Sequence, residues 1–352
     1  MENIENKGAT SLGPVKHPWR MMGILLSLLV LLMVANVIWG ALRIPLDAMP
    51  DLLLGRDVAG HPSWVYIIWH SRIPQMLTAT ICGASLATCG LLLQTAFRNP
   101  LAGPSILGID SGACLGVALA MMLSFGNVTL GGMGLSGYLL TVVSAMAGAI
   151  GIMLLLSVLN GILRSHVMLL ITGVIISYIT GSLISLLQFW ATKDGLQAYV
   201  LWGMGNFSSV GSERMPYFMA LSAVGLLLAL LMMKLLDALL LGDRYAHNLG
   251  VNTTRTRHLL LLTTGLLTAT STAFCGPISF IGLATPHIAR LLPDSGTHRH
   301  LLPQTMVLGA CIALLCNLLC NLPSSTILPI NVVTPLIGAP VIIYYCLHRP
   351  TN

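Results

Sequence analysis

The chain has 352 residues, of which 55% are hydrophobic and only 8% are charged. Soluble globular domains carry about 25% charged residues, so this composition excludes that class and indicates an integral membrane protein. The formal net charge of +6 then reports topology rather than a nucleic-acid partner, because basic residues gather on one side of a membrane protein.

Ten apolar runs are long enough to cross roughly 30 Å of hydrocarbon as helices. They are residues 21–42, 76–97, 104–124, 135–159, 167–190, 215–236, 258–275, 277–292, 301–322 and 332–347. We therefore predict an all-α, polytopic membrane protein with about ten transmembrane helices, consisting of a tail (1–20) and a single transmembrane domain (21–348). A cleaved signal peptide at 21–42 is the alternative, but that run exceeds the signal core of about 7–15 residues.

An even number of spans places both termini on one side of the membrane. Twelve of the seventeen lysines and arginines fall on that side: Lys7, Lys16, Arg20, Arg98, Arg164, Lys234, Arg244, Arg255, Arg257, Arg290, Arg299 and Arg349. The positive-inside rule therefore predicts that both termini and the tail are cytoplasmic. Basic and acidic residues cancel in the loops of the other side, so the excess positive charge is cytoplasmic.

All eight cysteines lie within or at the edge of apolar runs, and none lies in a long outer loop. We interpret them as small buried hydrophobic residues rather than disulfide partners. Cys316 and Cys320 are four residues apart and would share a helix face, but no histidine or acid completes a metal site there. The sequence therefore predicts no metal centre.

The longest stretch between two spans on the cytoplasmic side is the loop 234–257, "KLLDALLLGDRYAHNLGVNTTRTR". Apolar and polar residues alternate in it with a roughly helical rhythm, interrupted by Gly242 and Gly250. The pattern predicts two short amphipathic helices and a turn at the membrane surface. They could anchor the loop at the interface or form a docking surface for a cytoplasmic protein.

The sequence contains no phosphate-binding loop of the form G-x-x-x-x-G-K-[ST], so it offers no nucleotide-hydrolysing site of that kind. Active transport would then be driven by a separate ATPase or by an ion gradient. A gradient-driven carrier is expected to place ionisable residues within its spans. Asp110, in "ILGIDSGACLG", is the only acid inside a predicted span, and it could instead be a polar group that faces a neighbouring helix or a wet cavity.

Four blocks of the sequence carry a resemblance to a known family. They are "SRIPQMLTATICGASLATCGLLLQTAFRNPLAGPSILGIDSGA" (71–113), "LLLGDRYAHNLGV" (239–251), "CGPISFIGLATPHIARLL" (275–292) and "LPINVVTPLIGAP" (328–340). Together they resemble the FecCD-type permeases, the membrane subunits of ABC importers for iron-siderophores, haem and cobalamin. The resemblance implies ten helices per subunit, a homodimer with the path along its two-fold axis, two cytoplasmic ATPases and an extracytoplasmic substrate-binding protein.

The loop block is similar to the family's coupling helices, which sit in a groove of the ATPase. The residues that this resemblance assigns to coupling are Leu241, Gly242, Asp243, Arg244, Asn248, Leu249 and Gly250. It places Asp243 at the acidic position and Gly250 at the turn between the two short helices. A helix pair fixed to two spans can pass a rocking motion of the ATPases into the membrane, as a two-state element biased from outside.

The resemblance also assigns residues to the transport path. Asn99, Pro100 and Leu101 match a turn near the cytoplasmic mouth, although Asn and Pro also suit a plain tight turn. His166 and Val167 fall where a second gate strip is expected, and Asp110 is the remaining candidate within the path.

On the outer face, the family uses arginines to receive acidic residues of the binding protein. Arg72 matches one such position, whereas Gln75 and Cys320 occupy positions where the family pattern has arginine. The expected docking patch is therefore thinner here, and Arg56 and Arg214 are the candidates that could compensate.

The stretch "GPISFIGLATPHIAR" (276–290) is unusual for a membrane segment. Pro277, Gly282 and Pro286 interrupt a regular helix, and freed backbone groups are tolerated only where protein or a wet cavity satisfies them. We predict a short, kinked span packed against other helices. His287 and Arg290 fall near its cytoplasmic end, where their charge need not be buried, and we interpret His287 as a packing or capping group.

Two short segments are alike, "GPSILGI" (103–109) and "GPISFIGL" (276–283). The first opens a span from the inside and the second opens a span from the outside. Opposite orientations of one motif hint at an inverted repeat, which is a common plan for transporters.

We therefore expect an inner-membrane permease subunit, not an enzyme, that imports its cargo by alternating access. No nucleophile with a base, no HExxH motif and no paired carboxylates stand in the sequence. No cofactor is expected on this chain, and a partner ATPase would use ATP and Mg. An iron chelate, either a ferric siderophore or haem, is the first choice of cargo, and cobalamin is the alternative. A gradient-driven secondary transporter is a further alternative.

Overall fold

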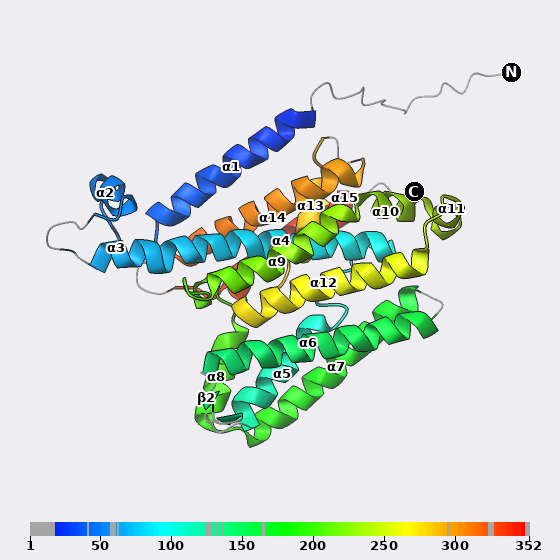
Figure 1. Ribbon diagram of the computed structural model, residues 1–352, viewed down its shortest axis with the longest axis horizontal. Helices are drawn as coiled ribbons and strands as arrows, with labels where there is room; N and C mark the ends of the chain where they lie inside the picture. Colours follow the sequence, from blue (N-terminus) through cyan, green and yellow to red (C-terminus); the bar gives the residue numbers. More distant parts are fainter. Residues whose placement is uncertain are drawn as a thin grey trace.

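The computed structural model describes residues 18–40, 42–56, 61, 63–123, 129–130, 133–134, 137–163, 166–293, 296–322 and 327–348. These residues form a bundle of long helices that run roughly side by side (Figure 1). The predicted all-α class is confirmed, apart from one hairpin of two-residue strands, β1 (Thr129–Leu130) and β2 (Met133–Gly134). Most of the predicted tail, residues 1–17, lies outside the described residues.

Each of the ten predicted spans coincides with helix. The longer helices are α1 (Pro18–Ile38), α4 (Ile73–Phe97), α5 (Ile109–Leu123), α6 (Gly137–Ile162), α7 (His166–Trp190), α9 (Met215–Leu231), α12 (Thr253–Cys275), α13 (Ile281–Arg290), α14 (His298–Cys320) and α15 (Ile330–His348). The shorter ones are α2 (Met49–Leu53), α3 (Ser63–Ile67), α8 (Lys193–Gly203), α10 (Met233–Leu241) and α11 (Asp243–Asn248). Short 3-10 turns lie at Leu46–Ala48 and Phe207–Ser209, and a π-helical turn at Ile68–Arg72 joins α3 to α4.

The number of true membrane spans stays a prediction. In the described part of the chain, six helices are long and apolar enough to cross a membrane, and a seventh span arises if α9 and α10, bent by 49°, count as one. The apolar helices α5 and α15 are shorter. Helix α5 begins five residues later than predicted, because Pro104 and the positive φ of Gly108 (76°) hold the preceding residues in turns.

Helix α4 lies at the centre of the bundle and packs against α9, α12, α13 and α14. Small residues let its neighbours approach closely. A Cβ atom at Gly83 would lie 2.3 Å from the carbonyl oxygen of Gly309 in α14, and one at Gly90 would lie 1.6 Å from that of Gly282 in α13. Close approach at small residues is the usual way in which helices associate inside a membrane, where lipid removes the hydrophobic drive.

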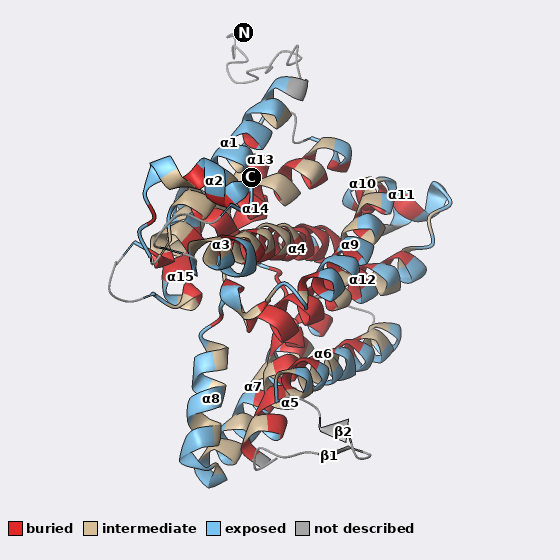
Figure 2. Ribbon diagram, turned by 60° about the vertical axis from the view of Figure 1, so that its left-hand side comes forward, coloured by how far each residue is buried: buried red, intermediate tan, exposed pale blue. Residues whose placement is uncertain are grey.

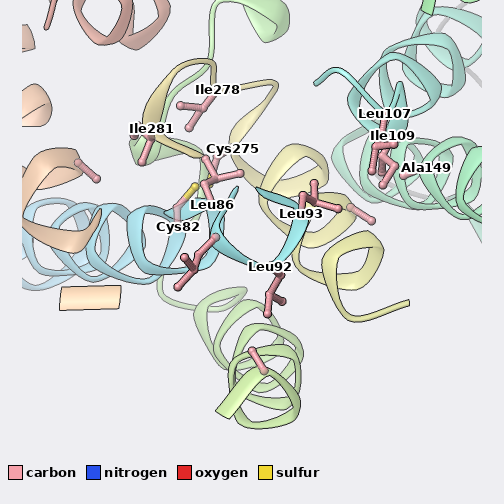
Figure 3. Close-up of a cluster of buried hydrophobic side chains, with 14 of the residues drawn as sticks. Cys82, Leu86, Leu92, Leu93, Leu107, Ile109, Ala149, Cys275, Ile278 and Ile281 are labelled. Carbon is pink, nitrogen blue, oxygen red and sulfur yellow. The ribbon is translucent and has the colours of Figure 1, made fainter. Parts of the chain in front are cut away.

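Aliphatic side chains and thiols fill the space around α4 (Figure 3). Cys82 and Leu86 of α4 are buried beside Cys275 at the end of α12 and Ile278 and Ile281 beyond it. Seven cysteines are described, and all seven are free thiols. No cluster of three or more metal-ligating side chains occurs among the described residues.

The bundle has two distinct ends (Figure 1). One end carries α10, α11 and the start of α1, and is called the α11 end below. The opposite end carries α2, α3, α8 and the β-hairpin, and is called the α8 end. The outer faces of α1, α6 and α7 are largely exposed, whereas α4 is buried almost throughout (Figure 2).

Candidate functional site

The loop 234–257 folds as a pair of short helices at the α11 end. Helix α10 ends at Leu241, and Gly242, whose φ is 113°, makes the sharp connection to α11. A second turn contains Gly250, whose φ is 80°, and Asn252 then caps α12 by accepting a hydrogen bond from the Arg255 amide at 3.0 Å. The two predicted short helices are therefore present.

One detail of the predicted pair is wrong. The residue between the two short helices is Gly242, and Gly250 lies in the following turn, between α11 and α12. Either glycine suits a position with positive φ. The sequence alone could not choose between them, because both interrupt the same apolar rhythm.

The helix pair presents an apolar surface to solvent. Leu240, Leu241, Tyr245 and Leu249 are 50%, 62%, 67% and 65% exposed, respectively. Arg244 and Asn248 are exposed beside them, whereas the side chain of Asp243 lies outside the described part of the structure. A cluster of large exposed apolar side chains at a polar end of the molecule is typical of a protein-protein contact.

The predicted gate turn lies at the same end, directly after α4. The Asn99 side-chain oxygen accepts a hydrogen bond from the Leu101 amide at 2.9 Å, which is a local asparagine turn. Leu101 is 48% exposed. His287 of α13 donates from Nε2 to the carbonyl oxygen of Pro100 at 2.8 Å, so the turn is tied to a second helix.

The other two gate candidates stand at the start of α7. Val167 is 63% exposed, and His166 is the first residue of the helix, with its side chain outside the described part. These two residues belong to α7, whereas the turn 99–101 follows α4, and no described contact joins the two sets. The gate role of each set stays a prediction.

Asp110 occupies the first turn of α5 and is almost fully buried. Its two carboxylate oxygens accept hydrogen bonds from Ser105 Oγ at 2.9 Å and Thr272 Oγ1 at 2.8 Å. Ser105 belongs to the turn before α5, and Thr272 to the end of α12. Asp110 therefore fastens the break at 103–108 to a neighbouring helix, as the interpretation of a polar group facing a neighbour expects.

The three predicted docking arginines lie in different settings. Arg72 is 5% exposed, and its guanidinium donates to the carbonyl oxygens of Val37 and Ile38, both at 2.7 Å, and to that of Leu42. It faces inward, because the last carbonyls of α1 have no partner within their own helix. The structure therefore gives Arg72 a capping role in place of the expected place on the outer surface.

Arg56 and Arg214 are more accessible. Arg56 pairs with Asp51 at 3.5 Å on the surface, and such exposed pairs contribute little to stability, so Arg56 can exchange partners. Arg214 is half-buried, and its guanidinium lies 3.6 Å from the centroid of the Tyr138 ring. Both belong to the α8 end, where the binding protein is expected to dock.

Gln75 stands where the family pattern has arginine, and it belongs to an uncharged network. Gln75 Nε2 donates to Asn317 Oδ1 at 2.9 Å, and Asn317 Nδ2 donates to Asn36 Oδ1 at 2.8 Å. Asn36 Nδ2 donates in turn to the carbonyl oxygen of Leu314 at 3.1 Å. The network joins α1, α4 and α14, and sequence analysis missed it because the three amides are far apart in the chain.

The broken segment after α12 is satisfied by protein, as predicted. Gly276 and Phe280 both have positive φ, 77° and 69°, so no helix forms before Ile281. Asn331 of α15 donates to the carbonyl oxygen of Pro277 and accepts from the Ser279 amide at 3.2 Å. Asn331 was not identified from the sequence, although an amide side chain on an apolar helix could have indicated a hydrogen bond to another segment.

The side chain of His287 is buried, at 1% exposure. Arg290 is partly buried, and it donates from Nη1 to the Gln94 side-chain oxygen in α4. Gln94 also donates to the Leu283 carbonyl oxygen at 3.3 Å. The interpretation of His287 as a packing or capping group is confirmed, because the side chain is buried and donates to the Pro100 carbonyl oxygen in the turn that follows α4.

The two similar segments, 103–109 and 276–283, meet in the structure. Gly103, Pro104 and Ser105 line a cavity of about 180 Å³ together with Ser279 and Phe280. The tertiary structure thus brings the two interruptions together beside α4, although 103–109 and 276–283 are far apart in sequence.

A larger cavity, of about 860 Å³, opens at the α8 end between α5, α6, α8 and α12. Tyr138, Thr192, Asp194, Trp202 and Phe274 are among its lining residues. Its volume lies in the range of small-molecule pockets.

Helix α8 also packs on α5. Burial raises the pKa of the Tyr199 hydroxyl on α8, and nearby Cys114 adds to the effect, so this phenol stays neutral. Helices α5 and α8 thus share both this packing and the large cavity.

A bundle of apolar helices with broken spans, satisfied internally, defines a multi-pass membrane permease. Residues 28–348 match the FecCD transport family, and the chain belongs to that family of inner-membrane ABC importer permeases. The resemblance read from the four sequence blocks is thus confirmed.

Several relatives support the assignment. The hemin transport permease HmuU of Yersinia pestis is 32% identical over 339 residues, 95% of this chain and 97% of the relative. The molybdate import permease MolB of Haemophilus influenzae is 32% identical over 96% of this chain and 98% of its own. The vitamin B12 import permease BtuC of Salmonella typhi is 36% identical over 80% of this chain and 83% of its own.

A solved structure is similar as well. It is a metal-chelate type ABC transporter in an inward-facing conformation, with a TM-score of 0.80 and 30% identity over 94% of this chain and the whole of the other. Fold and family therefore agree along almost the entire chain.

Proposed function

We propose that this permease acts as a homodimer with two cytoplasmic ATPase subunits and an extracytoplasmic substrate-binding protein, and that it imports an iron chelate. The chain would hold no cofactor of its own, and ATP and Mg would be used by the ATPases. Transport would be alternating access, with cargo handed in at the α8 end and released at the α11 end.

The helix pair α10–α11 carries this proposal. Its exposed apolar side chains are Leu240, Leu241, Tyr245 and Leu249. We interpret them as a docking surface for a partner protein rather than an anchor at the membrane surface, because they lie close together on two helices joined at a glycine. The excess of basic residues in the loops of that end favours a cytoplasmic location. An ATPase that docks there would act on spans α9 and α12, between which the pair is placed.

Two exposed apolar faces support the homodimer. Tyr178, Phe189 and Trp190 of α7 are 75%, 81% and 68% exposed, and Leu336 and Leu347 of α15 are 70% and 75% exposed. A second copy packed on these helices would bury them and would enclose a path between the subunits. Native mass spectrometry of the chain released from detergent tests this, with a mass of two chains expected and a single-chain mass contradicting the dimer.

The cargo proposal is supported by relatives. The hemin permease matches along 95% of this chain, and the structural neighbour is a metal-chelate type transporter. Cobalamin is the second candidate, because the vitamin B12 permease matches at 36% identity over a shorter range. A gradient-driven secondary transporter is the weakest alternative, since Asp110 is the only acid within the predicted spans.

The test is uptake into proteoliposomes that hold this chain and its partner ATPase, with binding protein outside and ATP sealed inside. The labelled cargoes are a ferric siderophore, haemin, cyanocobalamin and molybdate. We expect ATP-dependent uptake of an iron chelate. Asp243→Lys should lower it about ten-fold or more, because charge reversal at a docking contact weakens the contact. Glu5→Lys, a charge reversal in the tail, should leave uptake unchanged.

Each outcome bears on a separate part of the proposal. Uptake of cobalamin or molybdate alone would replace the cargo and keep the importer. Uptake that does not depend on ATP but depends on a proton gradient would overturn the ATP-driven mechanism.

A further inference from the structure

Helix α10 is held at its middle, at Asp237, by a buried histidine of α14. His298, the first residue of α14, is 1% exposed. Its Nδ1 lies 2.8 Å from Asp237 Oδ1 of α10, and its backbone amide donates to the same oxygen at 2.9 Å. Asp237 thus caps α14 from another helix, because α14 has no side-chain cap of its own at Thr297.

The other ring nitrogen of His298 reaches a third helix. Its Nε2 lies 3.0 Å from Thr95 Oγ1 near the end of α4, and Thr95 is itself 2% exposed. A neutral ring that donates from Nδ1 to Asp237 and accepts at Nε2 from the Thr95 hydroxyl satisfies all three groups. The imidazole therefore bridges α10 and α4 while it belongs to α14.

A second bond joins α10 to the end of α4. Arg98 follows Phe97 in the left-handed conformation, with a φ of 46°, and its Nη2 donates to the carbonyl oxygen of Leu239 at 2.7 Å. Leu239 lies in the last turn of α10, and its carbonyl oxygen also accepts a hydrogen bond from the Gly242 amide at 3.3 Å. The strained backbone at Arg98 aims its side chain at that turn.

The bonds continue from Arg98 to the predicted gate. Arg98 directly precedes the turn Asn99–Leu101, and His287 of α13 holds Pro100 of that turn at 2.8 Å. A continuous set of bonds thus runs from α10, one helix of the docking pair, through the end of α4 to the turn and to α13.

We propose that His298, with Asp237, Thr95 and Arg98, forms a brace that carries movement of the helix pair α10–α11 to the turn 99–101. These are positioning residues, and none of them needs to touch the cargo. The inference rests on the proposed function, in which an ATPase docks on α10–α11.

Directional bonds suit this task better than apolar packing. Apolar contacts are non-directional and let helices slide, whereas two hydrogen bonds to one ring fix the angle of α10 relative to α4 and α14. A packed element with two discrete arrangements can pass on a displacement. Leucine at position 298 would fill the site but would not fix that angle.

The first test compares cargo moved per ATP hydrolysed in proteoliposomes of the full complex. His298→Leu should lower this ratio by about three- to ten-fold while ATP hydrolysis continues. Asp237→Leu should have the same effect, and the double variant should be no worse than either single one, because both act through one bond. His300→Leu, two residues along the same helix, is the matched control and should keep the wild-type ratio.

A folding defect would not change that ratio, since fewer intact complexes lower transport and hydrolysis together. A His298→Leu complex with the wild-type ratio would overturn the brace as a transmission element. Partial recovery in His298→Asn, which keeps polar groups at the site, supports the bonds themselves as the cause.

The second test does not depend on ATP. Hydrogen-deuterium exchange of the full chain in nanodiscs should show amides of α10 exchanging several-fold faster in His298→Leu than in wild type, with α7 unchanged. Equal exchange in α10 would overturn the brace. If the wild-type complex shows no ATP-driven uptake, the proposed function and the transmission role fail together, whereas faster exchange would still establish the tie between α10, α4 and α14.

Discussion

Helices α4 and α7 have the same length, 25 residues, and both are strongly apolar. Their surroundings differ sharply. In an 18-residue apolar stretch of the span that contains α4, 78% of the residues are buried, against 28% in the corresponding stretch of α7. Helix α4 touches neighbours on all sides, whereas one face of α7 is open (Figure 2). Apolar character therefore tells which segments enter the membrane, but not which of them become the centre of the bundle.

The difference lies in small and amide residues. Gly83 and Gly90 of α4 each meet the backbone of another helix, and Gln75 and Gln94 bond to residues of α13 and α14. On α7, the hydroxyls of Thr172, Ser182 and Ser185 donate to carbonyls of their own helix, as threonine hydroxyls of α4 also do, so these bonds hold no second helix. Inside a membrane, contacts of the first kind draw helices together.

The largest expected effect comes from filling the closest contact of α4. Gly90→Leu should lower the free energy of unfolding by about 3 kcal/mol or more, because its Cβ would overlap the Gly282 backbone, which cannot yield as a side chain can. The measurement is unfolding in detergent by SDS titration. Gly181→Leu on α7, where no atom of the same chain lies within 4 Å of the added Cβ, should change the free energy of unfolding of the single chain by less than about 0.5 kcal/mol. Equal losses in both variants would refute the comparison.

An intermediate effect is expected from the amide network. Asn317→Leu leaves Gln75 and Asn36 each without one hydrogen-bond partner, and it should cost about 1 to 2 kcal/mol in the same assay. Ser182→Ala removes an exposed hydroxyl of α7, so its cost should stay below about 0.5 kcal/mol. If the two variants lower the free energy of unfolding equally, side-chain hydrogen bonds do not account for the difference between α4 and α7.

The smallest effect is expected at Asp110. This residue belongs to α5, a helix that packs against both α7 and α12. Asp110→Asn removes any charge but keeps an oxygen that accepts from one of the two hydroxyls and an amide that can donate to the other, so ATP-driven uptake should stay within about two-fold of wild type. Its dependence on external pH should also be unchanged. Loss of uptake together with loss of a proton-gradient dependence would instead assign Asp110 to proton coupling.

Much of the fold could be predicted because it depends on local pattern. Apolar runs locate the helices, and the glycines and prolines of 276–286 locate the break before α13. The docking pair was predicted from the rhythm of 234–257, with an error only in which glycine joins the two helices. These features follow from the length, periodicity and backbone preferences of short segments.

The candidate site was less predictable at residues whose side chains can lie either within the bundle or on its surface. Arg72 resembles a surface docking residue, but it caps α1 because three carbonyls lie within reach of its guanidinium. His287 was expected to pack or cap, but only the structure shows that it is fully buried and that its partner is the carbonyl oxygen of Pro100. Neither Asn331 nor His298 was identified from the sequence, since their hydrogen-bond partners are distant in the chain.

The sequence by itself determined that this chain crosses the membrane many times, that a helix breaks within 276–286 and that the chain belongs to a family of ABC importer permeases. Only the tertiary structure decided that α4 is the buried centre, that Asn331 satisfies the broken backbone and that His298 joins three helices. The physical reason is that lipid satisfies apolar side chains equally well on any helix. The arrangement is therefore set by close backbone approaches and by hydrogen bonds between residues far apart in sequence.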